Sequence, residues 1–308
     1  MALLSVRTCS SVARSCRWPY LCRRDQSKFL CSRIERVAVV GMTESERFHF
    51  DLAGFLVRPA ILSADELAEI RDQIDRIKHN PKSLPPEHRS VPGGPSSLLI
   101  DHPKVIEVLH DLIGPNIRLE SPGCVWRKKG ERHGDLHGGG PKQIDPIFGY
   151  RVQNERIHAG MVRVIFELSD IGKGDAGTHF IAGSHKANFP MHPDHLELDD
   201  ESKRSPFLVN YECPAGSAVF FSENTCHAGP EWKRDDPRVT ILHAYSHLAT
   251  HWHRLHVPPV VLNSLPPEKR AYFREPWIAD FRSKPTTHNT IERFVEKEDS
   301  VIRTDHQP

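Results

Sequence analysis

The residues with the clearest chemical potential lie in the segment 131–140, which reads ERHGDLHGGG. His133 and Asp135 are two residues apart, and on an extended strand such a pair points to one face and can share a metal ion. A third ligand is available in His227, which follows Asp135 by 92 residues. Two histidines and one carboxylate form a facial triad, which leaves positions open on a non-haem Fe(II) for a cosubstrate and dioxygen.

A candidate anion-binding residue comes eleven residues after His227, where Arg238 begins a β-rich run. A guanidinium holds a carboxylate through two parallel hydrogen bonds, as a bound 2-oxo acid would require. The candidate metal ligands and this arginine together therefore indicate an Fe(II) site that takes a 2-oxo acid as cosubstrate.

The elements before this segment are predicted to be helical. Ser63 and Glu66 form a capping-box pattern, and an apolar stripe at helical spacing follows over 67–77. A second amphipathic helix is expected over 103–113, closed by Gly114 and a proline. The Pro-, Gly- and Ser-rich stretch 81–97 between them is expected to be a loop.

From about residue 117 the apolar period changes to two, which is typical of half-buried strands. Many short strands after a helical pair favour a mainly β fold, a double-sheet jelly roll with flanking N-terminal α-helices, over a parallel α/β sheet. A short helix is expected at 267–274. The predicted strands are 117–120, 157–168, 178–183, 207–213, 217–222 and 238–246.

The ordered set of His133-x-Asp135, the tract GDAGTHFIAGSHK at 174–186, His227 and Arg238 resembles the phytanoyl-CoA dioxygenase family of Fe(II)/2-oxoglutarate oxygenases. The run FLV after Gly54 and the SADEL segment that follows are similar to the family's N-terminal segment. The resemblance covers about residues 48–250.

This resemblance implies a double-stranded β-helix, a jelly-roll or cupin-like barrel, in which His133, Asp135 and His227 bind Fe(II). Arg238 is then expected to pair with the far carboxylate of 2-oxoglutarate, and Thr240, on the same strand face, to add a hydrogen bond. In the family, dioxygen and 2-oxoglutarate react at the iron, carbon dioxide and succinate are released, and a carbon of the substrate is normally hydroxylated.

A second register of the motif is present, because His137 is followed by Gly138 and Gly139. In that register His137 and His227 are the ligands and glycine replaces the carboxylate, as in related halogenases, where chloride fills the vacant position. We favour His133 and Asp135, because a carboxylate at the correct offset neutralises metal charge without a substitute ion. The glycine run then forms a turn or a close approach of backbone to substrate.

The composition excludes several classes of protein. With 308 residues and a formal net charge of +1, the chain lacks the basic field that binds nucleic acid, and no apolar run is long enough to span a bilayer. Residues 1–24 contain five arginines and no acidic residue, which is typical of a mitochondrial transit peptide. A disordered basic tail or a wrongly assigned start codon is the alternative, with a cytoplasmic location.

We therefore expect a basic extension over 1–40, an oxygenase domain over 45–257 and a Pro-rich, charged tail over 258–308. The leading hypothesis is a hydroxylase for a small or lipid-like molecule, with substrate loops at 141–156 and 187–205 and an unknown oligomeric state. The alternatives are the halogenase-like enzyme, a degenerate jelly roll that only binds a ligand, and a zinc hydrolase, which would not need Arg238.

Several other residues invite chemical interpretations. The histidines between His243 and His256 have no specific metal-site spacing, so we expect polar surface, and Cys226 is expected to be a small buried residue. Tryptophans 126, 232 and 252 are expected to be packing residues. Arg163 and Glu167 share a strand face, and they either line the barrel interior or pair with each other outside it.

Overall fold

The computed structural model describes residues 41–138, 149–189, 191–252, 254–274 and 276. The predicted N-terminal extension, part of the predicted loop at 141–156 and most of the C-terminal tail lie outside these residues. Within the described residues, no helix has the length and apolar character needed to cross a membrane.

The first elements are a helix and a strand that the sequence interpretation missed. Helix α1 (Glu44–Ala53) begins at Thr43, whose side chain and Glu46 form a capping box, and it ends at Gly54 with φ 85°. Strand β1 (Phe55–Arg58) follows directly. The apolar and aromatic segment FHFDLAGFLV at 48–57 therefore divides between two elements, because Gly54 adopts the left-handed conformation that ends a helix.

The two predicted helices are present. α2 (Ala64–His79) has the expected capping box of Ser63 and Glu66, and α3 (Pro103–Leu112) is followed by Gly114 with φ 117°. The stretch between them, expected to be loop, contains three 3₁₀ helices, at Pro81–Ser83, Pro86–His88 and Gly94–Ile100.

The strands form two antiparallel sheets and a hairpin. The predicted strand at 157–168 is divided at Gly160 into β5 and β6, and the strand expected at 117–120 continues to Arg127. The major sheet has the order β1-β9-β6-β11-β2, with β2 (Ile117–Arg127), β6 (Met161–Glu167), β9 (Ser217–Ser222) and β11 (Arg238–His247). The minor sheet has the order β3-β10-β7-β8, with β3 (His133–His137), β7 (His179–Ile181), β8 (Leu208–Val209) and β10 (His227–Gly229), and β4 (Tyr150–Gln153) pairs with β5 (Arg156–Ala159).

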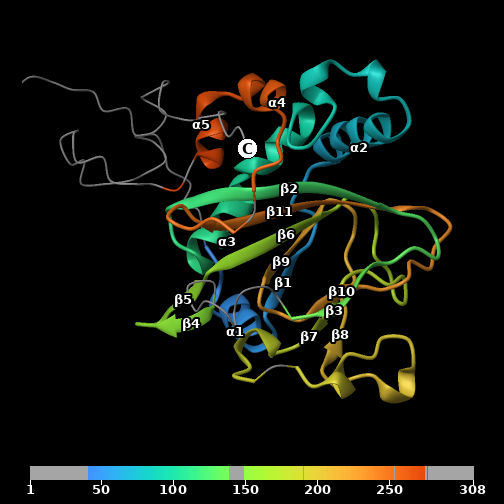
Figure 1. Cartoon of the computed structure of the whole chain (residues 1–308), viewed down its shortest axis with the longest axis vertical. Coiled ribbons are helices and arrows are strands. Elements are labelled where there is room, and N and C mark those ends of the chain that lie inside the picture. The colour runs from blue at the N-terminus through green and yellow to red at the C-terminus, as the bar shows by residue number, and fades with distance from the viewer. Residues whose placement is uncertain (1–40, 139–148, 190, 253, 275, 277–308) are drawn as a thin grey trace, which may run out of the picture. The chain divides into compact units, whose positions relative to one another are not determined.

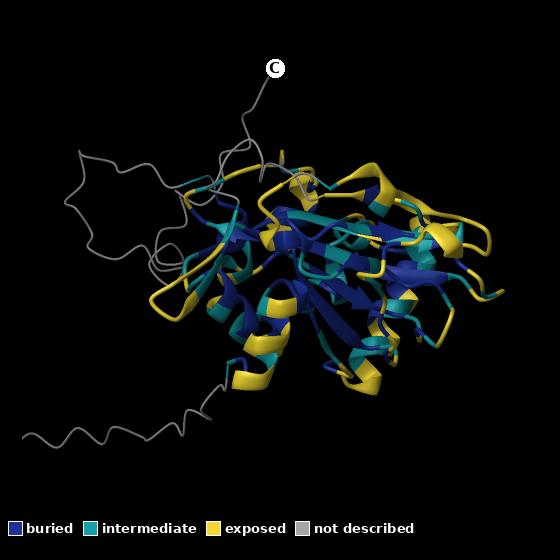
Figure 2. Ribbon diagram, turned by 90° about the horizontal axis from the view of Figure 1, so that it is seen from below, coloured by how far each residue is buried: buried dark blue, intermediate teal, exposed yellow. Residues whose placement is uncertain are grey.

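Helices α2 and α3 pack on the outer face of the major sheet, and the minor sheet lies against its inner face (Figure 1). One apolar core joins residues of α2 and α3 to Val239 and Ile241 of β11, and a second joins Ile165 and Phe221 to Phe180 of the minor sheet. Figure 2 shows the central strands as the buried part of the molecule, beneath more exposed helices and loops. This is the predicted jelly roll with flanking helices.

The described part of the C-terminal tail completes the outer core. The sequence interpretation missed α4 (Pro259–Ser264), whereas the helix expected at 267–274 is present as α5 (Pro267–Arg270) and a 3₁₀ turn, Ala271–Phe273. Val261, Leu262 and Phe273 are buried in the same cluster as the helices before β2. The tail therefore contributes to the core rather than only to the surface.

Candidate active site

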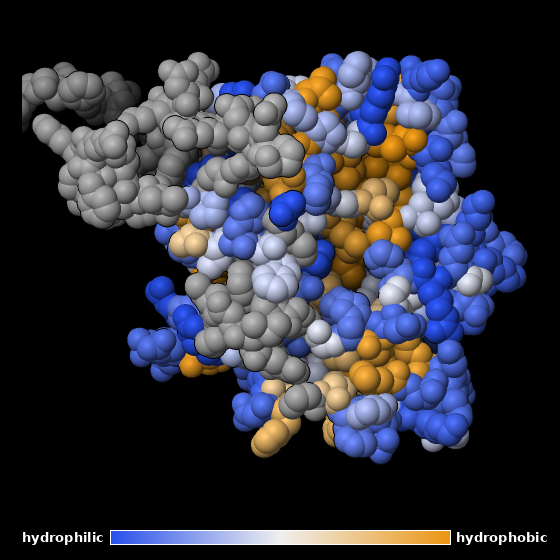
Figure 3. Space-filling view, in the orientation of Figure 1, coloured by the Kyte–Doolittle hydropathy of each residue, from blue (hydrophilic) through white to orange (hydrophobic). Residues whose placement is uncertain are grey.

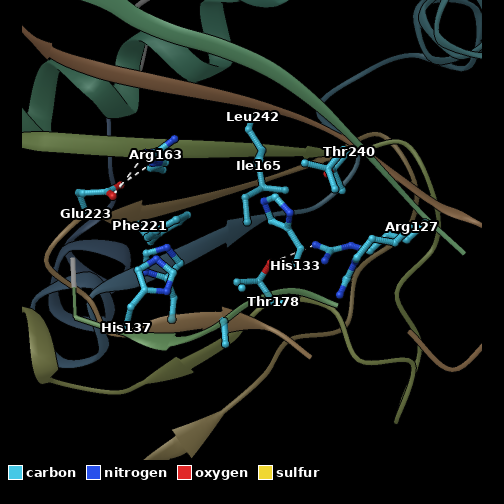
Figure 4. A pocket seen from close by; sticks show the side chains of 16 residues that line it. Arg127, His133, His137, Arg163, Ile165, Thr178, Phe221, Glu223, Thr240 and Leu242 are labelled. Carbon is cyan, nitrogen blue, oxygen red and sulfur yellow. Dashed lines mark hydrogen bonds and ion pairs between the residues drawn. The ribbon is translucent and has the colours of Figure 1, made fainter. Parts of the chain in front are cut away.

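The two sheets enclose a cavity of about 220 Å³. Its wall on the major-sheet side comes from β2, β6, β9 and β11, and its opposite wall comes from β3 and β10 (Figure 4). On the face of the molecule in Figure 3, hydrophobic residues form a hollow surrounded by hydrophilic ones. The lining residues are Val125, Arg127, His133, Gly134, His137, Arg163, Ile165, Thr178, Phe221, Glu223, His227, Ala228, Gly229, Arg238, Thr240 and Leu242.

The alternation of β11 decides which of its residues reach this cavity. Arg238, Thr240 and Leu242 line it, whereas Val239 and Ile241 lie in the core beneath the helices. Successive side chains of a strand point to opposite faces of the sheet, so the predicted pair Arg238 and Thr240 share the inner face. The prediction that Arg238 and Thr240 lie on the same face of the strand is confirmed.

The cavity contains a closely spaced pair of histidines from two neighbouring strands. His137 of β3 is the registered partner of His227 of β10, and the centroids of the two imidazole rings are 4.3 Å apart. Phe221 borders the pair, with its ring centroid 4.7 Å from that of His227. The structure thus brings together the two histidines of the second register.

Both imidazoles of this pair are held in the same tautomer. Nδ1 of His137 donates to the carbonyl oxygen of Asp135, and Nδ1 of His227 donates to that of Thr225, each at 2.7 Å. Because a carbonyl oxygen only accepts, the proton of each neutral ring is on Nδ1 and the lone pair is on Nε2. Such backbone hydrogen bonds orient imidazoles as metal ligands.

Burial keeps His227 in the form that binds a metal. It lowers the pKa of His227 to about 4, against a smaller opposing effect of the Glu223 carboxylate. A ring with this pKa is neutral at physiological pH, and a metal ion does not have to displace a proton from it.

Asp135 does not share a face with His133, contrary to the expectation from their spacing. Its side chain is 91% exposed, lies 3.8 Å from Arg132 and is not part of the cavity lining. The cause is Gly134, whose φ of 79° interrupts the alternation, together with a register shift between β3 and β10. The role of Asp135 as a ligand stays a prediction, and binding a metal in the cavity would require its side chain to turn inward.

His133 lines the cavity, and Figure 4 shows it near Thr178 rather than beside His137. Burial, and then the positive charges of Arg127 and Arg238, lower the pKa of His133. Among the residues that the structure describes, no three side chains of histidine, cysteine, aspartate or glutamate form a ready-made metal site.

The inner end of the cavity contains a buried ion pair. Arg238, with a side chain 5% exposed, donates through Nε to Glu167 at 3.1 Å and through Nη2 to the other carboxylate oxygen of the same residue. Nη2 also donates to the hydroxyls of Thr178 and Tyr211, at 3.1 and 3.0 Å. Burial is the largest single effect and lowers the pKa of Arg238, but the charges of Glu167 and Tyr211 and the hydrogen bond to Glu167 together outweigh it, and the net pKa is raised.

Arg127 is a second buried arginine at this end, and the sequence interpretation missed it. It is 2% exposed, and its guanidinium donates to the backbone carbonyls of Pro230 and Ala176, the latter at 3.1 Å. Burial, and then the charge of Arg238, lower the pKa of Arg127 to about 10. The only sequence signal is its place in a strand that extends seven residues beyond its predicted end at Glu120.

Arg163 and Glu167 were expected either to line the barrel interior or to pair with each other outside it, and in the structure each has a different partner. Nε of Arg163 donates to Glu223 at 2.5 Å, and both residues line the cavity, whereas Glu167 pairs with Arg238. Arg163 and Glu167 therefore do not form an outward-facing pair. Glu223 is the one acidic residue in the cavity lining among the described residues.

The expectations for His243, Cys226 and the three tryptophans are partly confirmed and partly wrong. His243 is fully buried, with Nδ1 3.1 Å from the Tyr245 hydroxyl, so it is core rather than polar surface. Cys226 is buried as expected, and burial raises its pKa to about 11. Trp232 is fully buried and Trp126 packs against the core, but Trp252 is 46% exposed and is not a core residue.

The fold and the cavity define a double-stranded β-helix with a paired-histidine site. Residues 129–240, which include every candidate ligand, match the family model described as phytanoyl-CoA dioxygenase. The resemblance seen in the sequence is thereby confirmed over this segment. No curated protein sequence matches the chain.

Among solved structures, HygX from Streptomyces hygroscopicus has a similar fold. Its apo form aligns with a TM-score of 0.58 and 21% identity over 70% of this chain and 91% of HygX. Its complex with nickel and 2-oxoglutarate aligns with a TM-score of 0.58 and 20% identity over 72% and 94%. The iron-bound form aligns with a TM-score of 0.56 and 20% identity over 83% and 100%. These similarities confirm the predicted fold class.

Proposed function

We propose that this protein is a non-haem Fe(II)- and 2-oxoglutarate-dependent oxygenase that hydroxylates a small-molecule substrate. The observation that carries the proposal is the facing pair of His137 and His227, with both Nε2 lone pairs available and one family match covering both residues. Support also comes from HygX, which has been solved with nickel, 2-oxoglutarate and hygromycin B bound.

The donor set fits two of the three expected iron ligands. His227 is common to both registers of the motif, and its pairing with His137 favours His137 over His133 as the second imidazole. Bound iron would supply the positions at which 2-oxoglutarate and dioxygen meet and react. Asp135 completes the triad only if its exposed side chain turns inward, and Gly139 lies outside the described residues.

The chain's own residues also suggest where 2-oxoglutarate lies. Arg238, Thr178 and Thr240 are at the inner end of the cavity, and a guanidinium with hydroxyls beside it suits a carboxylate. Ile165, Phe221 and Leu242 give the cavity apolar walls that exclude water from the reacting groups. The Arg163–Glu223 pair adds charged groups for a polar part of the substrate.

A second candidate function is a halogenase-like reaction. It is favoured by one observation: the histidine that faces His227 is the one followed by two glycines, while Asp135 is directed to solvent. Chloride would then take the ligand position that a carboxylate otherwise fills. A chloride-dependent, halogenated product would separate this function from hydroxylation.

The test of the proposed function is turnover of 2-oxoglutarate. Purified protein reconstituted with Fe(II) should convert 2-oxoglutarate to succinate slowly without substrate and faster with the correct one, and His227→Ala should abolish the conversion. The matched control is His192→Ala, a change of an exposed histidine outside the cavity. Succinate release that is equal in wild type and His227→Ala would contradict the proposal.

A further inference from the structure

The inner end of the cavity has an uncompensated positive charge. Two arginines, Arg127 and Arg238, are both at least 95% buried there. Among the described residues one carboxylate contacts them, that of Glu167, and it forms its ion pair with Arg238. Counting charges at this end therefore leaves one positive charge inside a low-dielectric region, where an unpaired ion is costly.

That charge is on Arg127. Within the described residues Arg127 has no ion pair with a carboxylate, and its hydrogen-bond acceptors are two neutral backbone carbonyls. Its Nε is buried without a hydrogen-bond partner in the described part of the chain. The guanidinium also lies over the ring of Trp232, at 5.9 Å from the ring centroid, which fixes its plane.

The surrounding backbone leaves room for this guanidinium at the cavity wall. A Cβ atom built on Gly229 of β10 would lie 3.2 Å from Nη1 of Arg127 and 2.7 Å from the carbonyl oxygen of His133. A glycine at this position therefore lets β3, β10 and the arginine approach each other closely. Figure 4 shows Arg127 at the same end of the cavity as Thr178 and Thr240.

We propose that Arg127 supplies the net positive charge that binds a carboxylate of an anionic ligand in this cavity, in addition to the hydrogen-bond donors of Arg238, whose own charge is balanced by Glu167. The ligand class is a short dicarboxylate. Naming 2-oxoglutarate as the natural ligand rests on the proposed function, whereas the anion site itself does not.

The test uses the full-length protein without metal and glutarate as the probe, because glutarate has both carboxylates of 2-oxoglutarate but lacks the 2-oxo group that chelates iron. Calorimetric titration should show binding to wild type and a loss of about 10- to 100-fold in affinity in Arg127→Gln, since a charge-assisted hydrogen bond is removed. Arg127→Lys keeps the charge and should lose less than Arg127→Gln. Lys129→Gln is the matched control, because it removes an exposed positive charge nearby and should bind glutarate as wild type does.

A second variant keeps the proposal testable if Arg127→Gln folds poorly. Gly229→Ala keeps both arginines, but its Cβ atom would lie 3.2 Å from Nη1 of Arg127 and should displace that guanidinium, so it should also weaken glutarate binding. Absence of glutarate binding to wild type, or wild-type glutarate affinity in Arg127→Gln or, where that variant does not fold, in Gly229→Ala, would overturn the proposal. If Arg127-dependent binding is observed but Fe(II) gives no turnover of 2-oxoglutarate, the anion site stands and the proposed function fails.

Discussion

Neutralising Glu167 tests the charge balance on which the inner end of the cavity depends. Glu167 is fully buried and accepts hydrogen bonds from Nε of Arg238 at 3.1 Å, from Nη2 of the same residue and from the Tyr211 hydroxyl at 2.5 Å. Glu167→Gln keeps the size of the side chain but leaves the buried guanidinium of Arg238 without its counter-charge. Breaking a buried ion pair in this way costs about 3–5 kcal/mol.

Because glutamine retains one acceptor oxygen for Arg238, we expect the lower end of that range, about 3 kcal/mol of unfolding free energy. Urea denaturation at pH 7.5 measures it, and Glu212→Gln, an exposed neighbour, should change the unfolding free energy by less than about 0.5 kcal/mol. The double variant Glu167→Gln/Arg238→Gln should be more stable than Glu167→Gln alone, since no charge is then left unpaired. A loss below about 1 kcal/mol in the single variant, or a double variant as unstable as the sum of both single variants, would refute this reasoning.

Three further predictions concern pH, packing and location. Burial lowers the pKa of His179 to about 4 and of His243 to about 3, so the unfolded chain binds more protons than the folded one below about pH 6.5. Unfolding free energy should therefore fall by roughly 2 kcal/mol per histidine between pH 6.5 and pH 5, and urea denaturation at the two pH values with no such fall would contradict the assignment. Gly229→Ala should destabilise the protein by about 1–3 kcal/mol and weaken glutarate binding, because its Cβ atom would overlap the carbonyl oxygen of His133. Urea denaturation and calorimetric titration with glutarate measure the two effects, and unchanged curves in both would show that β3 and β10 adjust freely. For the basic segment 1–24 we propose mitochondrial import, and the N-terminus of the protein from a mitochondrial fraction should lie after this segment, whereas an intact Met1 or Ala2 in the cytosol would contradict it.

The sequence predicted the elements whose local signals agree with their packing. Helix α2 has both a capping box and an apolar stripe, and β9 is found over the same residues, 217–222, that its apolar run indicated. The interpretation of the sequence does not include helix α1, although Thr43 and Glu46 form a capping box, because the aromatic residues continue across Gly54 and hide the boundary between the helix and β1. His243 shares strand parity with Val239 and Ile241, and this alternation was the signal that it is a core residue.

The sequence predicted which types of residue form the candidate site, but it predicted only part of how their side chains are arranged. The spacing of His133 and Asp135 implied a shared face, but a glycine between them can leave the extended conformation, and Gly134 does. Which histidine faces His227 depends on the pairing of strands about 90 residues apart, and spacing within one segment does not determine that register. Arg127 belongs to no motif, and the charge balance on which its proposed role rests exists only after folding.

The most direct test of the central claim, that His137 and His227 hold the metal, is anaerobic titration of the Fe(II)-loaded protein with 2-oxoglutarate, followed by its metal-to-ligand charge-transfer absorption. We expect the band in wild type, its loss in His137→Ala and His227→Ala, and its retention in His133→Ala. In Asp135→Ala, retention would mean that the carboxylate is not a ligand, and weakening would mean that it turns inward to complete the triad. A band that persists in His137→Ala and disappears in His133→Ala would contradict the account and restore the register that the sequence first favoured.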